Sequence, residues 1–438
     1  MSGRTPQPGS APGSGPASGP RGELAFWITV FLPFSAGAFL SNLFRSVNAV
    51  IAPDLSAALG LGPAALGFVT AAYFVTFAGF QIPLGILLDR FGPRAAQAAL
   101  LPLAALGAAV FALGDDIVTL AIGRGLIGLG VCGAVLASLK AITLWYPPSR
   151  LAFANGVFMA AGSAGALAAT TPVEWALTMT DWRGVYGALA LAVLGSALWV
   201  WIAVPRGGRS APGAGAPTMG AALGAVYGSR FFWRIAPVCA ISCAANLALQ
   251  GLWAGPWLSD VAALDRPAVA VHLLALGAAL TLGFAVMGLL ADLLGRIGVP
   301  TLAVIAGGLL VNQAAQLGLA LEAVELALPL WILVGLFGQF GSLGFAVLAR
   351  HFPPWLAGRG LTGLSFMIFF GAFLLQYGVG ALIEGWAPTP AAGAGYPRAA
   401  YQAALFGLLA LQVLALIWAV LPRRRDQRRG PGGTAGRC

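Results

Sequence analysis

Three basic residues stand inside long apolar stretches of the sequence, where charged side chains are rare: Arg45, Arg124 and Lys140. An arginine in the middle of a bilayer costs on the order of 3 kcal/mol, so it needs a partner or a function. Arg45 lies nine positions before Asp54, and Arg124 lies eight positions after Asp116. On two antiparallel helices, these spacings place both guanidinium groups at one depth, about 12 Å from the same surface. Two such cations repel each other unless an anion, water or backbone carbonyls compensate them, and we expect this pair to bind an anion.

Asparagines accompany the first cation. Asn42, Arg45 and Asn48 follow each other at intervals of three, so they share one helical face. We interpret this face, together with Arg124, as the anion-facing part of a substrate-binding site. Other roles stay open: Arg45 can snorkel to the membrane surface, and Arg124 can be a structural arginine bound to the backbone of neighbouring helices. For Lys140, near the end of its apolar stretch, snorkelling is the better explanation.

A second polar face lies much later in the chain. Asn246, Gln250 and Trp253 are spaced by four and three residues, so on one helix they could hydrogen-bond and stack a ligand. Ordinary packing explains this face equally well. No nucleophile–base pair, phosphate loop or metal-ligand spacing accompanies these residues, and the four cysteines are scattered. We therefore expect no enzyme, no cofactor and no metal site.

The elements that must position these residues are membrane helices. Of the 438 residues, 59% are hydrophobic and 9% are charged, and the mean hydropathy is +0.86. Soluble proteins carry about 25% charged residues. A membrane span needs about 20 apolar residues. The sequence thus predicts an all-α integral membrane protein with twelve spans, near 24–51, 63–88, 95–113, 117–144, 152–174, 184–204, 235–258, 267–291, 297–320, 326–349, 361–384 and 399–421.

The charges orient these spans. With the N-terminus in the cytoplasm, the cytoplasmic segments hold eighteen arginines, and the outer segments hold three, Arg183, Arg266 and Arg398. This asymmetry predicts that both termini are cytoplasmic. The excess of positive charge, +10 in total, then lies in a cytoplasmic rim that faces lipid headgroups, and it does not indicate a surface that binds nucleic acid. Lys140 is the only lysine among the many basic residues. This preference for arginine over lysine indicates a GC-rich genome and therefore a bacterial inner membrane.

A short pattern, G-x-x-x-D-x-x-G, occurs twice with an offset of 203 residues and indicates two parallel six-helix halves. We expect its glycine to allow close approach to a neighbouring helix and its aspartate to bind a helix N-terminus or an arginine, as a latch that breaks when the halves move apart. The alternative is an anchor without a conformational role. The latch residues are Gly85, Asp89, Arg90, Gly92 and Arg94 in the first copy and Gly288, Asp292, Gly295 and Arg296 in the second.

The repeat and the composition divide the chain into five parts. These are a disordered cytoplasmic tail (1–22), an N-terminal six-helix half (23–204), a cytoplasmic linker (205–233), a C-terminal six-helix half (234–421) and a basic cytoplasmic tail (422–438).

Residues 24–421 resemble the major facilitator superfamily. The resemblance is carried by the twelve spans, by Gly85-x-x-x-Asp89-Arg90-x-Gly92-x-Arg94 and by Arg124-x-x-x-Gly128-x-Gly130. It implies a monomeric bundle with a central cavity, lined mainly by the first, fourth, seventh and tenth helices. The stretch RSVNAVIAPDLSAALGLGPAALG around Arg45 is similar to the organic-anion and sugar-phosphate permease branch, in which an arginine of the first helix meets the negative charge of the substrate.

We accordingly expect a secondary transporter that moves a small organic anion, such as a carboxylate, by rocker-switch alternating access. A drug–proton antiporter is the main alternative, and a membrane-embedded ligand sensor is another. The sequence leaves a coupling proton and a counter-anion both open. Glu174, near the outer end of helix 152–174, is the candidate proton site: it could pair with Arg45 or Arg124 and release that arginine on protonation. An ordinary surface carboxylate is the alternative.

Overall fold

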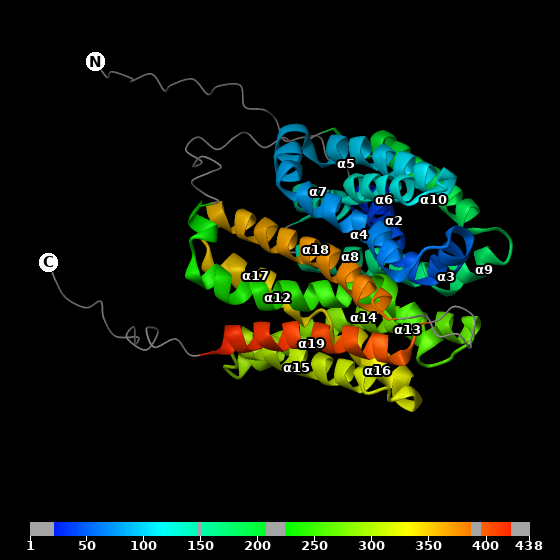
Figure 1. Cartoon of the computed structure of the whole chain (residues 1–438). Coiled ribbons are helices and arrows are strands. Elements are labelled where there is room, and N and C mark those ends of the chain that lie inside the picture. Colours follow the sequence, from blue (N-terminus) through cyan, green and yellow to red (C-terminus); the bar gives the residue numbers. More distant parts are fainter. Residues whose placement is uncertain (1–21, 148–149, 207–223, 387–395, 422–438) are drawn as a thin grey trace, which may run out of the picture.

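The structure is a computed structural model that describes residues 22–147, 150–206, 224–386 and 396–421. The tails 1–21 and 422–438 and most of the linker 205–233 lie outside the described residues, so the division into these parts stays a prediction. Within the described ranges, every regular element is a helix. Figure 1 shows the first half, coloured blue to blue-green, packed against the second half, coloured green to red.

The first half forms spans 1 to 6. In chain order, these are α1 (Glu23–Phe26), the π-helix η1 (Trp27–Phe31), α2 (Leu32–Ser46) and α3 (Asn48–Leu59) for span 1; α4 (Pro63–Gly79) and α5 (Gln81–Leu113) for spans 2 and 3; α6 (Ile117–Val131) and α7 (Ala134–Trp145) for span 4; α8 (Leu151–Ala168) and α9 (Thr171–Leu177) for span 5; and α10 (Trp182–Ala203) for span 6.

The second half forms spans 7 to 12. These are α12 (Arg230–Ala248), the π-helix η3 (Leu249–Trp253) and α13 (Ala254–Asp260) for span 7; α14 (Arg266–Arg296) for span 8; α15 (Thr301–Ala320) for span 9; η4 (Val324–Leu326), α16 (Ala327–Phe337), η5 (Phe340–Ser342) and α17 (Leu343–His351) for span 10; α18 (Pro354–Glu384) for span 11; and α19 (Arg398–Val420) for span 12.

The predicted twelve-span fold is confirmed, with one irregular span. In the described residues, eleven helical stretches are long and apolar enough to cross a membrane, and Pro63–Gly79 is a shorter apolar helix. The second span is shorter than the others because its helix is interrupted at Phe80. The next helix, α5, begins at Gln81 and runs through the expected loop into span 3. The turn between spans 2 and 3 is made by Gly92, whose φ of 79° and ψ of 168° interrupt an otherwise helical backbone.

Gly92→Ala is expected to lower the melting temperature of the purified protein by several degrees. The backbone of Gly92 lies in a region that residues with a Cβ avoid, at a cost of about 1–3 kcal/mol. Gly85→Ala is the matched control, since a Cβ there would meet nothing within 4 Å. Thermal unfolding in detergent compares the two variants. Equal melting temperatures would show that the turn does not depend on the glycine backbone.

The halves are joined near one end of the bundle, which we call the distal end: α3 and α18 end there, and α4 and α14 begin there. Glycines allow the contact between α4 and α18. The Cβ position of Gly67 lies 2.9 Å from the backbone oxygen of Gln376, and that of Gly380 lies against the backbone oxygen of Pro63. The opposite, proximal end is where α1 begins and α14 ends.

Candidate functional site

Arg45 is a partly exposed cation in the middle of the first span. It lies near the end of α2, among buried neighbours, and its Nη2 donates to Oδ1 of Asn42. Asn42 Nδ2 donates in turn to the backbone oxygen of Ala38 at 3.0 Å. Among the described residues, no carboxylate forms an ion pair with Arg45. A guanidinium group has five N–H donors, so Arg45 keeps donors for an anionic ligand.

Arg124 lies in a closed network and is 1% exposed. Its Nη1 donates to the backbone oxygen of Phe44 at 2.9 Å and to the hydroxyl of Tyr186 at 3.2 Å, and its guanidinium carbon lies 5.3 Å from the centre of the Tyr73 ring. The Tyr186 hydroxyl donates to Oδ1 of Asn48 at 3.0 Å. The structure thus joins Arg124 to Asn48 and separates both from Asn42. Enclosed in this way, Arg124 cannot touch a solute in this conformation.

The three residues of span 7 contact different neighbours, because the π-helix η3 changes the helical phase. Asn246 lies in α12, just before η3, and is buried. Its amide lies so close to Gly338 that a Cβ at that position would collide with it. Trp253, at the end of η3, donates from Nε1 to the backbone oxygen of Gln376 at 3.0 Å. Gln250 lies in η3, and its buried Oε1 has no hydrogen-bond partner in the described chain. The π-helix changes the spacing on which the prediction of a single face depends, and that these three residues bind a ligand stays a prediction.

Gln376 of α18 belongs to the polar centre and was not predicted. Its Nε2 donates to Oγ1 of Thr70 at 2.6 Å across the two halves, while its Oε1 has no partner among the described residues. This oxygen and the backbone oxygen of Arg45 lie 3.6 and 3.7 Å from the Cβ position of Gly251. A buried acceptor without a donor costs about 1–3 kcal/mol. The amide oxygens of Gln376 and Gln250 are therefore unpaired acceptors, and both are buried in this conformation.

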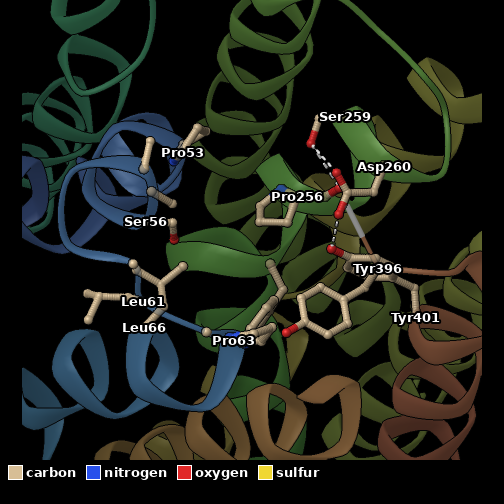
Figure 2. Close-up of a pocket in the computed structure, with 15 residues that line it drawn as sticks. Pro53, Ser56, Leu61, Pro63, Leu66, Pro256, Ser259, Asp260, Tyr396 and Tyr401 are labelled. Carbon is tan, nitrogen blue, oxygen red and sulfur yellow. Dashed lines mark hydrogen bonds between the residues drawn. The ribbon is translucent and has the colours of Figure 1, made fainter. Parts of the chain in front are cut away.

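A cavity of about 520 Å³ lies at the distal end (Figure 2). Asp260 is its charged lining residue, and it accepts hydrogen bonds from the Tyr401 hydroxyl at 2.5 Å and from the Ser259 hydroxyl at 3.1 Å. Trp253 also lines this cavity while it donates to the backbone of Gln376. The indole thus separates the cavity from the polar centre around Arg45.

The first copy of the repeated pattern contacts its own half. Arg94 donates from Nε and Nη2 to the backbone oxygen of Trp201 at 3.2 and 2.5 Å, and its guanidinium carbon lies 4.6 Å from the Trp201 ring centre. The guanidinium of Arg90 lies over the ring of Phe91, its neighbour in sequence. The side chain of Asp89 lies outside the described part of the structure. Arg94 therefore anchors α5 to the end of α10.

The second copy also keeps to its own half. Asp292 pairs with Arg296 one turn later at 2.8 Å. The close helix approach expected of the glycines is wrong for this conformation, because a Cβ at Gly85, Gly288 or Gly295 would meet nothing within 4 Å. That the pattern forms a latch between the halves stays a prediction.

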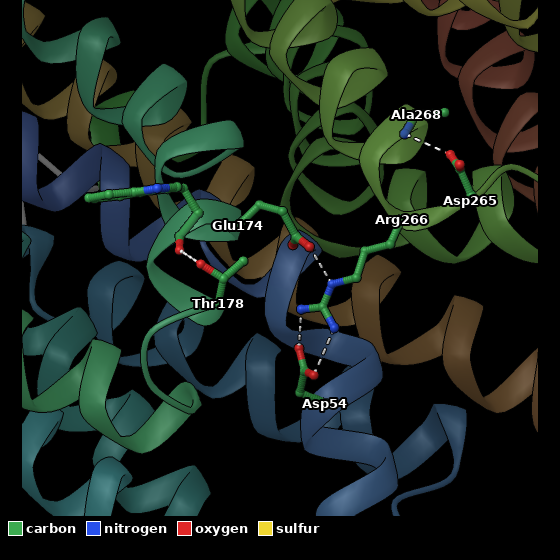
Figure 3. A network of polar contacts seen from close by, with 7 residues as sticks. Asp54, Glu174, Thr178, Asp265, Arg266 and Ala268 are labelled. Atoms are coloured by element: carbon green, nitrogen blue, oxygen red, sulfur yellow. Dashed lines mark hydrogen bonds and ion pairs between the residues drawn. The ribbon is translucent and has the colours of Figure 1, made fainter.

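Glu174 pairs with neither Arg45 nor Arg124, so the expected pairing is wrong. Its Oε1 lies 2.5 Å from Nε of Arg266, the first residue of α14. The other two nitrogens of Arg266 donate to the carboxylate of Asp54 at 2.9 and 2.7 Å (Figure 3). One arginine of the second half thus binds two carboxylates of the first half at the distal end. Glu174 lies in α9 at the distal end and pairs there with Arg266, away from Arg45 and Arg124 in the middle of the bundle.

The family model described as Major Facilitator Superfamily matches residues 34–339, which is more than half of the chain. The chain belongs to this superfamily. Its twelve spans in two halves agree with this membership.

Several relatives of known name within the superfamily are transporters. The hexuronate transporter of Escherichia coli (strain K12) is 29% identical over 165 residues, which cover 38% of this chain and 37% of the relative. The galacturonate transporter of Dickeya chrysanthemi is 30% identical over 165 residues, 38% of this chain and 46% of the relative. A probable sulfoacetate transporter of Cupriavidus necator is 27% identical over 158 residues, 36% of each chain. The chain thus aligns with less than half the length of each relative.

Solved structures share the fold over nearly the whole chain. A bacterial homologue of the human lysosomal transporter Spinster, in an inward-facing and unoccupied conformation, has a TM-score of 0.71 at 17% identity and covers 91% of this chain and 96% of its own. A D-xylose–proton symporter has a TM-score of 0.69 at 14% identity and covers 90% of this chain and 97% of its own. At such identities, the likeness establishes the architecture.

Proposed function

We propose that this protein is a secondary transporter that carries a small organic anion, a hydroxylated carboxylate such as a hexuronate, across the membrane by alternating access. The observation that carries the proposal is Arg45: it is partly exposed in the middle of the bundle and has no carboxylate partner among the described residues. An anionic substrate would compensate this charge. The partial relatives named for hexuronate, galacturonate and sulfoacetate support an anion of this size.

The groups around Arg45 suit the two parts of such a molecule. A carboxylate can accept bidentate hydrogen bonds from a guanidinium group. The unpaired amide oxygens of Gln250 and Gln376 on the other half are buried in this conformation, and hydroxyl groups of the substrate would donate to them only after the halves move. In this proposal, Arg124 and Asn48 do not contact the substrate but fix the backbone of span 1 behind Arg45.

The contacts between the halves support an inward-open conformation. Arg266 with Asp54 and Glu174, and Ala64 with Glu384, join the halves at the distal end. The partial exposure of Arg45 then implies a path from the proximal end. The arginine distribution supports a cytoplasmic location of the proximal end and of both termini. Rocking of the two halves about the polar centre would then expose Arg45 to the other side.

Uptake into proteoliposomes tests the function. We expect labelled glucuronate to accumulate saturably, to be displaced by excess galacturonate and to show counterflow, while a cationic dye is not moved. A cation would be repelled by the positive charge of Arg45 in the middle of the bundle, which counts against the drug–proton antiporter. Glucuronate binding without counterflow would identify a sensor instead, and dye movement without anion flux would establish the antiporter.

A further inference from the structure

Two glutamates end equivalent helices of the two halves at the distal end. Glu174 lies in α9, at the end of span 5, and Glu384 is the last residue of α18, which is span 11. Span 11 is the fifth span of the second half, just as span 5 is the fifth span of the first half. Each of the two carboxylates reaches across to the other half, although their partners are different chemical groups.

Glu384 caps the N-terminus of α4, which has no side-chain cap from the residue that precedes it. Its Oε2 accepts a hydrogen bond from the backbone N–H of Ala64 at 2.7 Å, in the first turn of α4. The residue before α4, Gly62, offers no side-chain cap, and its Cβ position lies 3.0 Å from the same carboxylate oxygen. The first N–H groups of a helix have no partner within the helix, and a carboxylate is favourable at that end. Glu384 thus supplies from the second half what α4 lacks.

Glu174 binds the start of the helix that corresponds to α4. Arg266 is the first residue of α14, which is the second span of its half as α4 is of the first. The ion pair of Arg266 with Glu174 buries most of the carboxylate, which is 19% exposed, while the arginine is 44% exposed. Asp54 binds the other two nitrogens, Nη1 and Nη2, of the same guanidinium (Figure 3). In both cases, a carboxylate at the end of the fifth helix of one half therefore holds the start of the second helix of the other half.

We propose that Glu174 and Glu384 form a pair of matched latches that keep the distal side closed, one on each side of the pseudo-symmetry axis. The inference rests on the alternating access proposed above. Opening the distal side moves α4 away from α18 and α14 away from α9, so both contacts must break. Each latch is partly solvated, which limits it to a shift of about two- to fivefold in the equilibrium between closed and open. Because the latches involve separate helix pairs, their effects multiply to about tenfold.

The position of the latches also separates gating from proton coupling. A group that carries a proton across the membrane must face each side in turn. Glu174 and Glu384 both lie at the distal end, with the polar centre between them and the proximal side. They therefore control which conformation the protein adopts and do not carry a coupling proton through it.

Distances between spin labels at the distal end test the latches without any substrate. Labels at Met179→Cys and Leu326→Cys, which replace exposed residues of the two halves, would report the opening in lipid nanodiscs, in a background with Cys438→Ser. The cysteines of the described chain are buried and would remain unlabelled. We expect Glu174→Ala and Glu384→Ala each to raise the ratio of long to short distances about two- to fivefold, and the double variant to raise it about tenfold.

Glu322→Ala is the matched control, because Glu322 pairs with Arg398 at 3.7 Å within the second half near the same end. Asp115→Ala is the counterpart in the first half, where Asp115 pairs with Arg183 at 2.6 Å. Neither should change the distance distribution. Unchanged distances in the double variant, or an equal shift in either control, would overturn the inference. If the double variant shifts the distances but the protein transports no anion, the latches are supported and only the proposed function is refuted.

Discussion

Arg45→Gln is expected to reduce glucuronate uptake about a hundredfold while the protein stays folded. The variant removes the charge that the substrate carboxylate would neutralise, and loss of a desolvated charge pair at a binding site costs about 2–5 kcal/mol. Glutamine keeps a donor for Oδ1 of Asn42, the partner of Arg45 in the structure. Initial uptake rates over a range of glucuronate concentrations measure the effect, and we expect the loss to appear as a higher KM.

Two further variants separate the charge of Arg45 from its shape. Arg45→Lys keeps the charge but loses the planar fork, so we expect about a tenfold loss of uptake. Asn42→Ala keeps the arginine and removes its partner, and its effect should be smaller. Wild-type uptake by folded Arg45→Gln protein would place the anion site elsewhere in the bundle. Equal losses in all three variants would indicate that span 1 is sensitive to any change.

The fold followed from the sequence because its strongest signals are local. Twelve apolar stretches and the repeated glycine–aspartate pattern can be read without knowing any contact. The interruption of span 2 at Phe80 was not predicted, because residues 63–88 were interpreted as one helix. Gly79 and Pro83 next to it weaken a helix, but such residues do not by themselves show whether a membrane helix is interrupted. The turn at Gly92 shows the same limit: the pattern indicated a loop, whereas the chain uses one residue of special backbone geometry.

The candidate site was less predictable because it depends on contacts between halves. Arg45 with Asn42 was visible as a polar face on one helix, and the structure keeps that pair together. The π-helix in span 7 could not be predicted, and it changes the phase between Asn246 and Trp253, whereas the spacing argument assumes a constant phase. Gln376 carries no spacing signal, so only the approach of α18 to α4 reveals it.

The role of Glu174 could not be derived for a similar reason. A pair with Arg45 or Arg124 was one possibility and a surface carboxylate the other, but Glu174 pairs with Arg266 of the other half. The sequence position of Arg266, in a short loop after the seventh span, gives no hint of which carboxylate it meets. Ion pairs between halves depend on the conformation of the whole bundle, which is also why they can act as latches.

Arg124→Ala is expected to have the largest effect on stability. Arg124 fills a fully buried position between four spans, so its truncation leaves a cavity and removes charge-assisted hydrogen bonds to Phe44 and Tyr186. Loss of a large buried side chain costs about 2–5 kcal/mol, and release of a buried charge offsets part of this. We therefore expect the free energy of unfolding to fall by about 2–4 kcal/mol, seen as a lower melting temperature in detergent.

Arg124→Lys decides between a structural and a substrate-binding role. Lysine keeps the charge, and its one nitrogen has enough donors for Phe44 and Tyr186, but its side chain is shorter and lacks the planar group that lies over Tyr73. A structural arginine therefore predicts a clear fall in the melting temperature. Tyr186→Phe, which removes one acceptor and the hydrogen bond to Asn48, should reproduce part of the loss. If Arg124→Lys instead retained wild-type stability and lost uptake alone, the guanidinium would act on the substrate. The closed network seen here would then have to open during transport.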